Sequence, residues 1–271
     1  MRNTKDPEEY KRKVQSIYDS MASSYNSYFE KGALKVLNEI IRRNLFAVIK
    51  KHHIKILDAG GGDGKLGLLF AKEGHNVTVV DISHQMLDKG RKRALKEELK
   101  GNISFIEGDL ENLAFFEDNF FDFIICEGSV LSFLPNPNLA LKEFYRIIKP
   151  GGEMIISVQN RLFFMWLGQS IPIMKSVWKT GRVYPQINAG ADYKCSSHSF
   201  TPNEFSECVE NAGLQIKRLG SRYMVANRLN SEERLDKDPL FFEEVVNMEL
   251  SMAWDENFIS FGRILTILAT K

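Results

Sequence analysis

Cysteine is scarce in this sequence, and its spacing suits neither a metal site nor a disulfide framework. Cys126, Cys195 and Cys208 are the three cysteines among 271 residues, and no two of them form a Cys-x-x-Cys pair. Zinc-binding modules and small secreted domains depend on such spacings, so both classes are excluded. We expect reduced, structural thiols in a cytoplasmic protein.

Long apolar runs and an excess of one charge are also absent. The longest apolar stretch, residues 162–174, is interrupted by Gly168, Gln169 and Pro172, and it is shorter than the roughly 18 residues that suggest a membrane span. The first residues are polar, so we expect no export signal. With 36 basic and 35 acidic residues, the formal net charge is +1, which predicts neither nucleic acid nor a membrane as partner, although a local basic patch is compatible with these totals.

The order of apolar segments is typical of an α/β fold. Asp6-Pro7-Glu8-Glu9 has the residues of a capped helix start, and helical periodicity continues to about Lys51. From Ile54 onward, short apolar runs alternate with amphipathic helices, which indicates parallel βαβ units. The expected strands cover residues 54–58, 76–81, 103–107, 121–126, 152–158, 214–219 and 259–270; the expected helices cover 65–73, 83–99, 138–148 and a segment that begins at Thr201 and stops at Gly213.

The strongest local signal is a glycine-rich turn between the first expected strand and its helix. Ile56-Leu57-Asp58 leads into Ala59-Gly60-Gly61-Gly62-Asp63-Gly64. Glycines let a ligand approach the backbone, and a helix start offers unpaired N–H groups. Gly62-x-Gly64-x-x-Gly67 also matches the dinucleotide fingerprint, with Asp81 at about the 20-residue offset of a ribose-binding acid. An NAD-binding oxidoreductase and a plain tight turn are therefore both open at this point.

This turn and several later motifs together resemble the class I S-adenosylmethionine-dependent methyltransferase family. Asp58-Ala59-Gly60-Gly61-Gly62 is similar to the family's first motif and Gly108-Asp109-Leu110 to its adenine-binding stretch; the segment 121–127 looks like the fourth-strand motif, and residues 148–152 look like the turn before the fifth strand. The likeness is close over residues 50–160 and weaker elsewhere. It implies a Rossmann-like, seven-stranded, mostly parallel sheet with an antiparallel last strand, helices on both faces and helical insertions that form a lid.

The resemblance implies S-adenosyl-L-methionine as the cofactor, and because the sequence holds no convincing metal-binding cluster, we expect no metal. In this interpretation Asp81 binds the ribose, and Asp109 accepts from the adenine amino group. The segment from Tyr18 to Tyr25 resembles a stretch that covers the cofactor, although the seven-residue spacing of the two tyrosines also fits ordinary core packing. The full expected set of cofactor residues is Tyr18, Tyr25, Asp58, Gly60, Gly61, Gly62, Asp81, Ile82, Met86, Asp109, Leu110, Glu127 and Gly128.

The expected reaction moves a methyl group to an oxygen or nitrogen atom of a small organic acceptor by in-line displacement. Such a reaction depends mainly on alignment, and it needs a base only when the acceptor is protonated. The sequence holds no Ser-His-Asp constellation and no His-Glu-x-x-His motif. Glu127, at the exit of the fourth strand, and His198, before the helix at Thr201, are the candidate catalytic residues. His198 also fits a structural histidine.

Two segments, 159–200 and 222–258, are longer than ordinary connections. Their aromatic side chains fit either the wall of an apolar acceptor pocket or the core of a helical subdomain. We expect residues 1–51 to form a helical lid, residues 52–158 and 201–271 the core, and the two insertions a cap over the acceptor pocket. The aromatic residues are Phe163, Phe164, Trp166, Trp178, Tyr184, Tyr193, Tyr223, Phe241, Phe242 and Trp254.

Other functions stay open beside this one. An RNA methyltransferase needs a basic groove, and the cluster Arg91-Lys92-Arg93 fits a solvated helix face better. A protein methyltransferase, a nicotinamide-dependent oxidoreductase and a cofactor-binding protein without turnover are also compatible with these residues. The sequence identifies neither the acceptor nor the oligomeric state.

Overall fold

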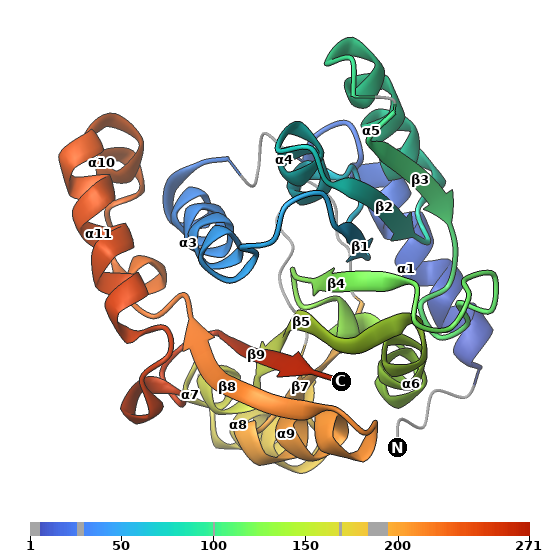
Figure 1. Cartoon of the computed structure of the whole chain (residues 1–271). Helices are drawn as coiled ribbons and strands as arrows, with labels where there is room; N and C mark the ends of the chain where they lie inside the picture. The colour runs from blue at the N-terminus through green and yellow to red at the C-terminus, as the bar shows by residue number, and fades with distance from the viewer. Residues whose placement is uncertain (1–5, 26–29, 100, 168–169, 184–194) are drawn as a thin grey trace.

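The fold is built on a mixed β-sheet between two layers of helices (Figure 1). The computed structural model describes residues 6–25, 30–99, 101–167, 170–183 and 195–271. Five parallel strands lie in the order β3-β2-β1-β4-β5, where β1 is Lys55–Ala59, β2 is Asn76–Asp81, β3 is Ile103–Glu107, β4 is Phe121–Cys126 and β5 is Ile148–Asn160. The first four match the predicted strands to within one residue at each end.

The last strand along the chain lies inside the sheet. β9 (Ile264–Thr270) runs antiparallel to β5, and β8 (Gln215–Arg222) pairs with the other side of β9. The predicted sheet with an antiparallel last strand is confirmed. Two short strands were not expected: β7 (Ser197–Phe200) pairs with the end of β5, and β6 (Arg182–Val183) pairs with β7.

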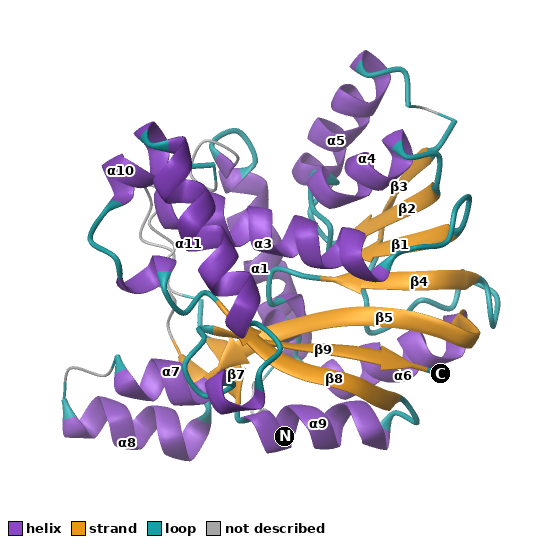
Figure 2. Cartoon of the chain, turned by 60° about the vertical axis from the view of Figure 1, so that its left-hand side comes forward, coloured by secondary structure: helices purple, strands orange, loops and turns teal. Residues whose placement is uncertain are grey.

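Helices cover both faces of the sheet, as predicted (Figure 2). On one face lie α3 (Gly32–Val48), α4 (Lys65–Lys72) and α5 (His84–Lys96); on the other lie α6 (Pro137–Ile147) and α9 (Pro202–Asn211). Successive residues of β5 serve the two layers alternately: Ile155 packs with the first group, whereas Met154 and Ile156 pack with the second. This alternation is the two-residue period of a strand that is buried on both faces.

Helix ends follow the predicted capping chemistry, with one exception. The Asp6 side chain accepts from the backbone of Glu8 and Glu9 at the start of α1 (Pro7–Met21), and Thr201 forms a capping box with Glu204 at α9. The prediction of continuous helix to about Lys51 is wrong, because α3 starts separately at Gly32. Side chains of the distant helix α10 (Glu232–Lys237) accept from the first N–H groups of α3, a contact that local periodicity does not reveal.

The insertion 222–258 forms a helical layer with α3. Val36 and Ile40 of α3 share an apolar cluster with Leu235 of α10 and with Val245 and Val246 of α11 (Pro239–Met252). Tyr223, Phe241 and Phe242 belong to the same cluster, so for these three aromatics the interpretation as a helical core is confirmed. Short 3-10 turns at Ala226–Arg228 and Glu256–Phe258 complete the insertion.

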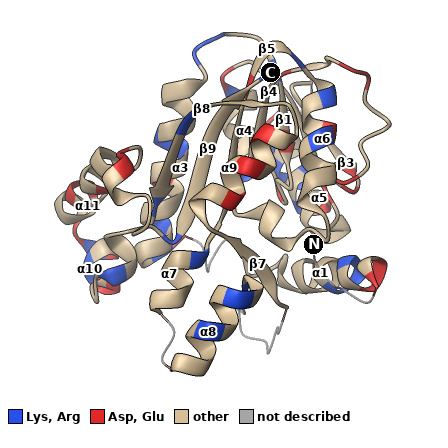
Figure 3. Ribbon diagram, turned by 90° about the horizontal axis from the view of Figure 1, so that it is seen from below, with Lys and Arg blue, Asp and Glu red and all other residues tan. Residues whose placement is uncertain are grey.

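The insertion 159–200 begins with a helical hairpin. α7 (Arg161–Trp166) follows β5 directly, and α8 (Ile171–Thr180) runs back beside it, so that the pair projects from the rest of the molecule (Figures 2 and 3). The returning chain contacts α1, because the Tyr10 hydroxyl donates to the Ser196 carbonyl at 2.7 Å. None of the helices in the described ranges has the length and apolar character that crossing a membrane requires.

Candidate cofactor site

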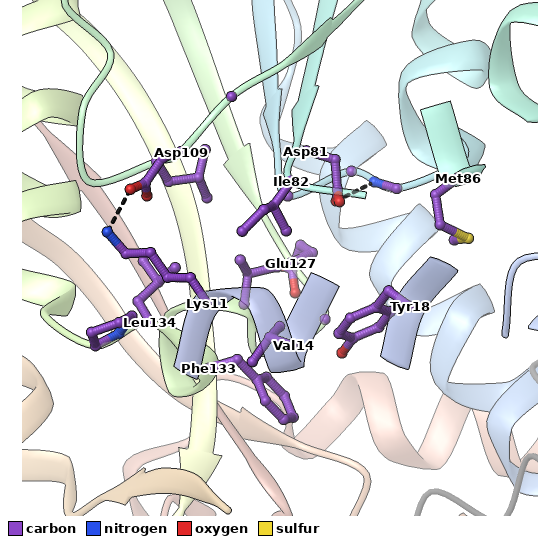
Figure 4. A pocket seen from close by; sticks show the side chains of 18 of the residues that line it. Lys11, Val14, Tyr18, Asp81, Ile82, Met86, Asp109, Glu127, Phe133 and Leu134 are labelled. Carbon is purple, nitrogen blue, oxygen red and sulfur yellow. Dashed lines mark hydrogen bonds and ion pairs between the residues drawn. The ribbon is translucent and has the colours of Figure 1, made fainter. Parts of the chain in front are cut away.

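A cavity lies beneath α1 at the carboxyl ends of β1, β2 and β4 (Figure 4). Its volume is about 840 Å³ when the solvent space at its open mouth is included. All but one of the expected cofactor residues line it, Asp58 being the exception. Gly108, from the expected adenine-binding stretch, also lines it, and six further lining residues had not been expected, namely Lys11, Val14, Val130, Phe133, Leu134 and Pro135.

The glycine turn forms one wall of the cavity. Gly60 has a φ of +70° and Gly62 a φ of +56°, in the left-handed region that glycine adopts without strain. A Cβ atom at Gly60 would lie 2.5 Å from the side chain of Val130, and one at Gly61 would lie 2.5 Å from the carboxyl carbon of Asp58. Bare backbone at these positions therefore meets the cavity on one side and packed side chains on the other.

Asp81, at the end of β2, holds the turn in place. Its carboxylate accepts from the N–H of Gly62 at 2.9 Å and from the N–H of Ser83 at 2.8 Å. Burial raises the pKa of Asp81 to about 6, although the hydrogen bonds from Ser83 and Gly62 oppose that rise. Asp81 thus braces the start of α5, and it also lines the cavity, where its oxygens retain lone pairs for hydroxyl donors.

Asp58 lies behind the glycine turn, and it does not line the cavity. It is buried and accepts from the N–H of Gly67 in α4 at 3.0 Å. Burial raises the pKa of Asp58 to about 7; the bond from Gly67 lowers it, while the charges of Asp81, Asp63 and Glu127 raise it further. Asp58 therefore supports the turn and adds negative charge beneath it.

The predicted adenine-binding acid, Asp109, is paired with a lysine of α1. Lys11 Nζ lies 2.6 Å from Asp109 Oδ2 and 3.0 Å from Glu111 Oε2. Burial alone would lower the pKa of Lys11, but its hydrogen bonds to these acids and to Glu8 outweigh burial and raise it. Lys11 was not predicted from the sequence, although its spacing of seven residues from Tyr18 sets both on one helical face.

Helix α1 is fastened across the cavity at several points. The Asp19 carboxylate accepts from the Ser83 hydroxyl at 2.6 Å and from the Gln85 N–H at 3.1 Å, at the start of α5. The Lys89 ammonium donates to the Ala22 carbonyl at 2.8 Å. Together with the bonds made by Lys11 and Tyr10, these contacts hold α1 as a cover over the glycine turn.

Tyr18 and Tyr25 both line the cavity and pack in an apolar cluster. The Tyr18 ring meets Phe133 edge to face, with centroids 6.3 Å apart, and lies 6.4 Å from the Tyr25 ring. Val14 and Cys195 belong to the same cluster. Burial raises the pKa of both tyrosines well above its usual value. The interpretation as core packing is therefore confirmed, and the role of the two tyrosines as a cover over the cofactor stays a prediction.

Glu127, at the end of β4, forms a buried ion pair that the sequence did not predict. Arg222 of β8 donates through Nη2 to Glu127 Oε1 at 2.9 Å, and both side chains are almost completely buried. The second oxygen, Oε2, is also buried and has no hydrogen-bond partner among the described residues. Because Glu127 lines the cavity, this carboxylate is oriented by Arg222 and retains an acceptor for a donor group of a ligand.

His198, expected to face the acceptor, does not line this cavity. It lies on β7 opposite Arg182, with its ring centroid 4.6 Å from that of Phe200. A role as base stays a prediction that the cavity does not support. Likewise, no described residue of 159–200 or 222–258 lines the cavity, so the acceptor-pocket cap also stays a prediction. Tyr184 and Tyr193 lie outside the described residues.

Comparison with known proteins relates the chain to methyl-transferring enzymes. A family model described as a methyltransferase domain matches residues 56–152. The ubiquinone/menaquinone biosynthesis C-methyltransferase UbiE of Bradyrhizobium diazoefficiens is 33% identical over 211 residues, which cover 74% of this chain and 83% of that protein.

Solved structures with little sequence identity share the fold. The [4+2]-cyclase SpnF is 18% identical in sequence and superposes with a TM-score of 0.61. The superposition covers 95% of this chain and 94% of the SpnF chain. An S-adenosylmethionine-dependent methyltransferase from Thermotoga maritima, described as a possible histamine N-methyltransferase, is 19% identical, with 94% and 99% coverage and a TM-score of 0.59. At such identities these likenesses establish the architecture alone.

Proposed function

Because the chain belongs to the class I S-adenosylmethionine-dependent methyltransferase family, we propose that it transfers a methyl group from this cofactor to a small organic acceptor by direct displacement. The cavity beneath α1 carries the proposal, since the glycine turn, Asp81 and Glu127 meet there. When bound, S-adenosylmethionine supplies a methyl group on a positively charged sulfur that is already a good leaving group. The protein's task is to bind and align.

Three acids are the proposed anchors of the cofactor. Asp81 accepts from the ribose hydroxyls, Asp109 from the adenine amino group, and Glu127 from the ammonium of the amino acid end. Asp81 and Asp109 already accept backbone N–H donors, and each carboxylate oxygen retains a further lone pair. Glu127 is the best-prepared acceptor, because its Oε2 is buried without a partner in the described part of the chain.

The charge of the cavity favours a cation and opposes NAD. The carboxylates of Asp81, Asp63 and Glu127 lie close enough to Asp58 to raise its pKa by repulsion. A ligand with a sulfonium and an ammonium group would relieve that repulsion, whereas the pyrophosphate of NAD would add to it. Lys11, which lines the cavity, is already paired with Asp109. Lys89 lies 3.5 Å from Asp63, and Arg222 pairs with Glu127, so among the described residues Asp58 and Asp81 are the acids of this group that have no cation partner.

The acceptor is expected against the apolar part of the wall. Val14, Phe133, Leu134 and Pro135 line the cavity, and such a surface suits a small organic molecule better than RNA, which needs exposed cations. We retain oxygen or nitrogen as the atom methylated. A carbon acceptor is the second candidate, because the curated relatives are named C-methyltransferases. Nuclear magnetic resonance of a product made with a deuterated methyl donor distinguishes the two.

Calorimetry with three ligands tests the cofactor assignment. We expect S-adenosylhomocysteine and 5′-methylthioadenosine to bind and NAD to give no heat. NAD binding alone would overturn the proposal. Strong S-adenosylhomocysteine binding without product from any acceptor in a broad metabolite panel would favour a binding protein without turnover.

The variant Glu127→Gln tests the anchor at the amino acid end. Loss of a hydrogen bond to a charged group costs about 1.5–3 kcal/mol, so S-adenosylhomocysteine should bind about 10- to 100-fold more weakly. Binding of 5′-methylthioadenosine, which lacks the amino acid end, should stay within about twofold of wild type. Glu117→Gln, a change at an exposed glutamate, is the matched control. An equal loss for both ligands would contradict the assigned contact.

A further inference from the structure

The hairpin of α7 and α8 exposes an unusual concentration of large apolar side chains. Trp166 is 74% exposed, Ile171 66% and Trp178 54%, and Leu167 and Ile173 are exposed as well. These five account for almost half of the large apolar side chains exposed in the described chain, and they fall within residues 166–178. Such a concentration marks an interaction surface, because scattered apolar residues are the normal condition of a protein surface.

Helix α8 carries part of this surface, and few of its own side chains are buried against the rest of the protein. Val177 is its one buried residue. Ile171, Met174 and Trp178 follow the spacing i, i+3 and i+7, which sets them along one face of the helix. Two of these three are exposed, so the apolar face of α8 is turned largely to solvent.

The same hairpin is basic, although the whole chain is nearly neutral. The sequence holds no Asp or Glu from residue 154 to residue 191. Lys175, Lys179 and Arg182 are exposed, and Figure 3 shows α8 with basic residues and no acidic ones. Within the described ranges, neither Lys175 nor Lys179 pairs with a carboxylate. The net charge of +1 conceals this local patch.

We propose that the α7–α8 hairpin docks on the surface of an anionic lipid bilayer. Tryptophan and isoleucine side chains enter the boundary between headgroups and acyl chains, and the adjoining lysines contact the anionic headgroups. Apolar residues with aromatic rings beside unpaired cations are the composition of interfacial helices. A second copy of the chain fits less well, because a two-fold contact through this hairpin would bring its cations against each other.

The hairpin is connected directly to the cavity wall. The hairpin starts where β5 ends, and β5 is hydrogen-bonded to the segment 129–133, part of which forms the cavity wall. The Ser129 N–H donates to the Ser157 hydroxyl at 3.2 Å, and the Gln159 N–H donates to the Ser132 hydroxyl at 2.9 Å. This segment contains Val130 and Phe133, which line the cavity. Docking would therefore bring that edge of the cavity close to the lipid.

Co-sedimentation of the full chain with vesicles tests the proposal. The protein should sediment with vesicles of phosphatidylcholine and phosphatidylglycerol, and much less with phosphatidylcholine alone or in high salt. One basic residue near an anionic surface contributes about a fivefold gain in partitioning, so Lys175→Gln/Lys179→Gln should bind roughly 25-fold more weakly. Trp166→Ser/Trp178→Ser should lose at least about tenfold through lost apolar burial.

Matched controls separate docking from general charge or stickiness. Lys92→Gln/Lys96→Gln removes two exposed cations from α5, and Leu240→Ser/Met248→Ser removes two exposed apolar groups from α11. Both should bind vesicles like wild type, and all variants should keep the wild-type unfolding temperature. The proposal is overturned if folded wild-type protein ignores anionic vesicles, or if the controls lose as much binding as the hairpin variants. It is also overturned if the tryptophan variant converts an oligomer to a monomer in solution.

Discussion

Replacing Asp58 with Asn should stabilise the protein without ligand and weaken its hold on a cationic cofactor. Asp58 is buried behind the glycine turn, and its pKa is raised from 3.8 to about 7, mainly by burial. The folded protein therefore binds more protons than the unfolded chain between these pH values. Stability that this group contributes is present at low pH and is lost as pH rises through 7.

The expected gain in stability of Asp58→Asn follows from the rise in the pKa of Asp58. Because one pKa unit corresponds to about 1.36 kcal/mol, ionised Asp58 costs the folded state about 4 kcal/mol at pH 8. An asparagine keeps an oxygen for the Gly67 N–H, but its buried amide group needs an acceptor, which costs about 1–3 kcal/mol. The net gain should be about 2 kcal/mol, or roughly 4–8 °C in unfolding temperature.

Thermal unfolding of the ligand-free protein between pH 5.5 and pH 8 measures the difference in stability between wild type and Asp58→Asn. Wild type should lose stability as pH rises, and Asp58→Asn should lose less, with Asp81 accounting for part of the remaining slope because its pKa is raised to about 6. Glu117→Gln, at an exposed carboxylate, is the control and should behave as wild type. An Asn variant that is less stable at pH 8, or that keeps the full pH slope, would refute the reasoning.

Three further substitutions test the site. In calorimetry, Gly61→Ala should bind S-adenosylhomocysteine more than about tenfold more weakly, because the new Cβ would lie 2.5 Å from the carboxyl carbon of Asp58. The control Gly101→Ala, whose Cβ would meet nothing within 4 Å, should bind like wild type. Arg222→Met leaves Glu127 buried without its cation and should lower the unfolding free energy in urea by about 3–5 kcal/mol; adding Glu127→Gln should recover part of this, and no recovery would contradict the pairing. His198→Gln should bind S-adenosylhomocysteine within about twofold of wild type, and a tenfold loss would show that this residue reaches the ligand.

Features that depend on neighbouring residues could be predicted from the sequence. β2, β3 and β4 have the predicted bounds, because each is a short apolar run closed by a turn. The capping box at Thr201 and the glycine turn at residues 60–62 likewise express local chemistry, and the turn is found beside Asp81 as expected. All of the expected cofactor residues except Asp58 therefore meet in one cavity, although their individual contacts are still proposals.

Features that depend on distant residues could not be predicted. Lys11 meets Asp109, and Arg222 meets Glu127, across about a hundred positions of sequence in each case, and no periodicity links such partners. The break before α3 depends in the same way on the Asp236 side chain. His198 depends on distant pairing in the same way: it follows a long insertion and suits a base, and the pairing of β7 with β6 sets it outside the cavity, so its role as a base stays a prediction.

The position of β9 has a consequence for how the protein is made. Among the described strands of this sheet it is the last to be synthesised, yet β5 and β8 both pair with it. Until the ribosome has released residue 270, β8 has no partner strand in this sheet and β5 presents an open edge, which nascent chains tend to fill by aggregation. Folding of this half of the sheet is therefore delayed until translation of β9 is complete, and a chaperone that shields β5 and β8 during that interval would raise the yield of soluble protein.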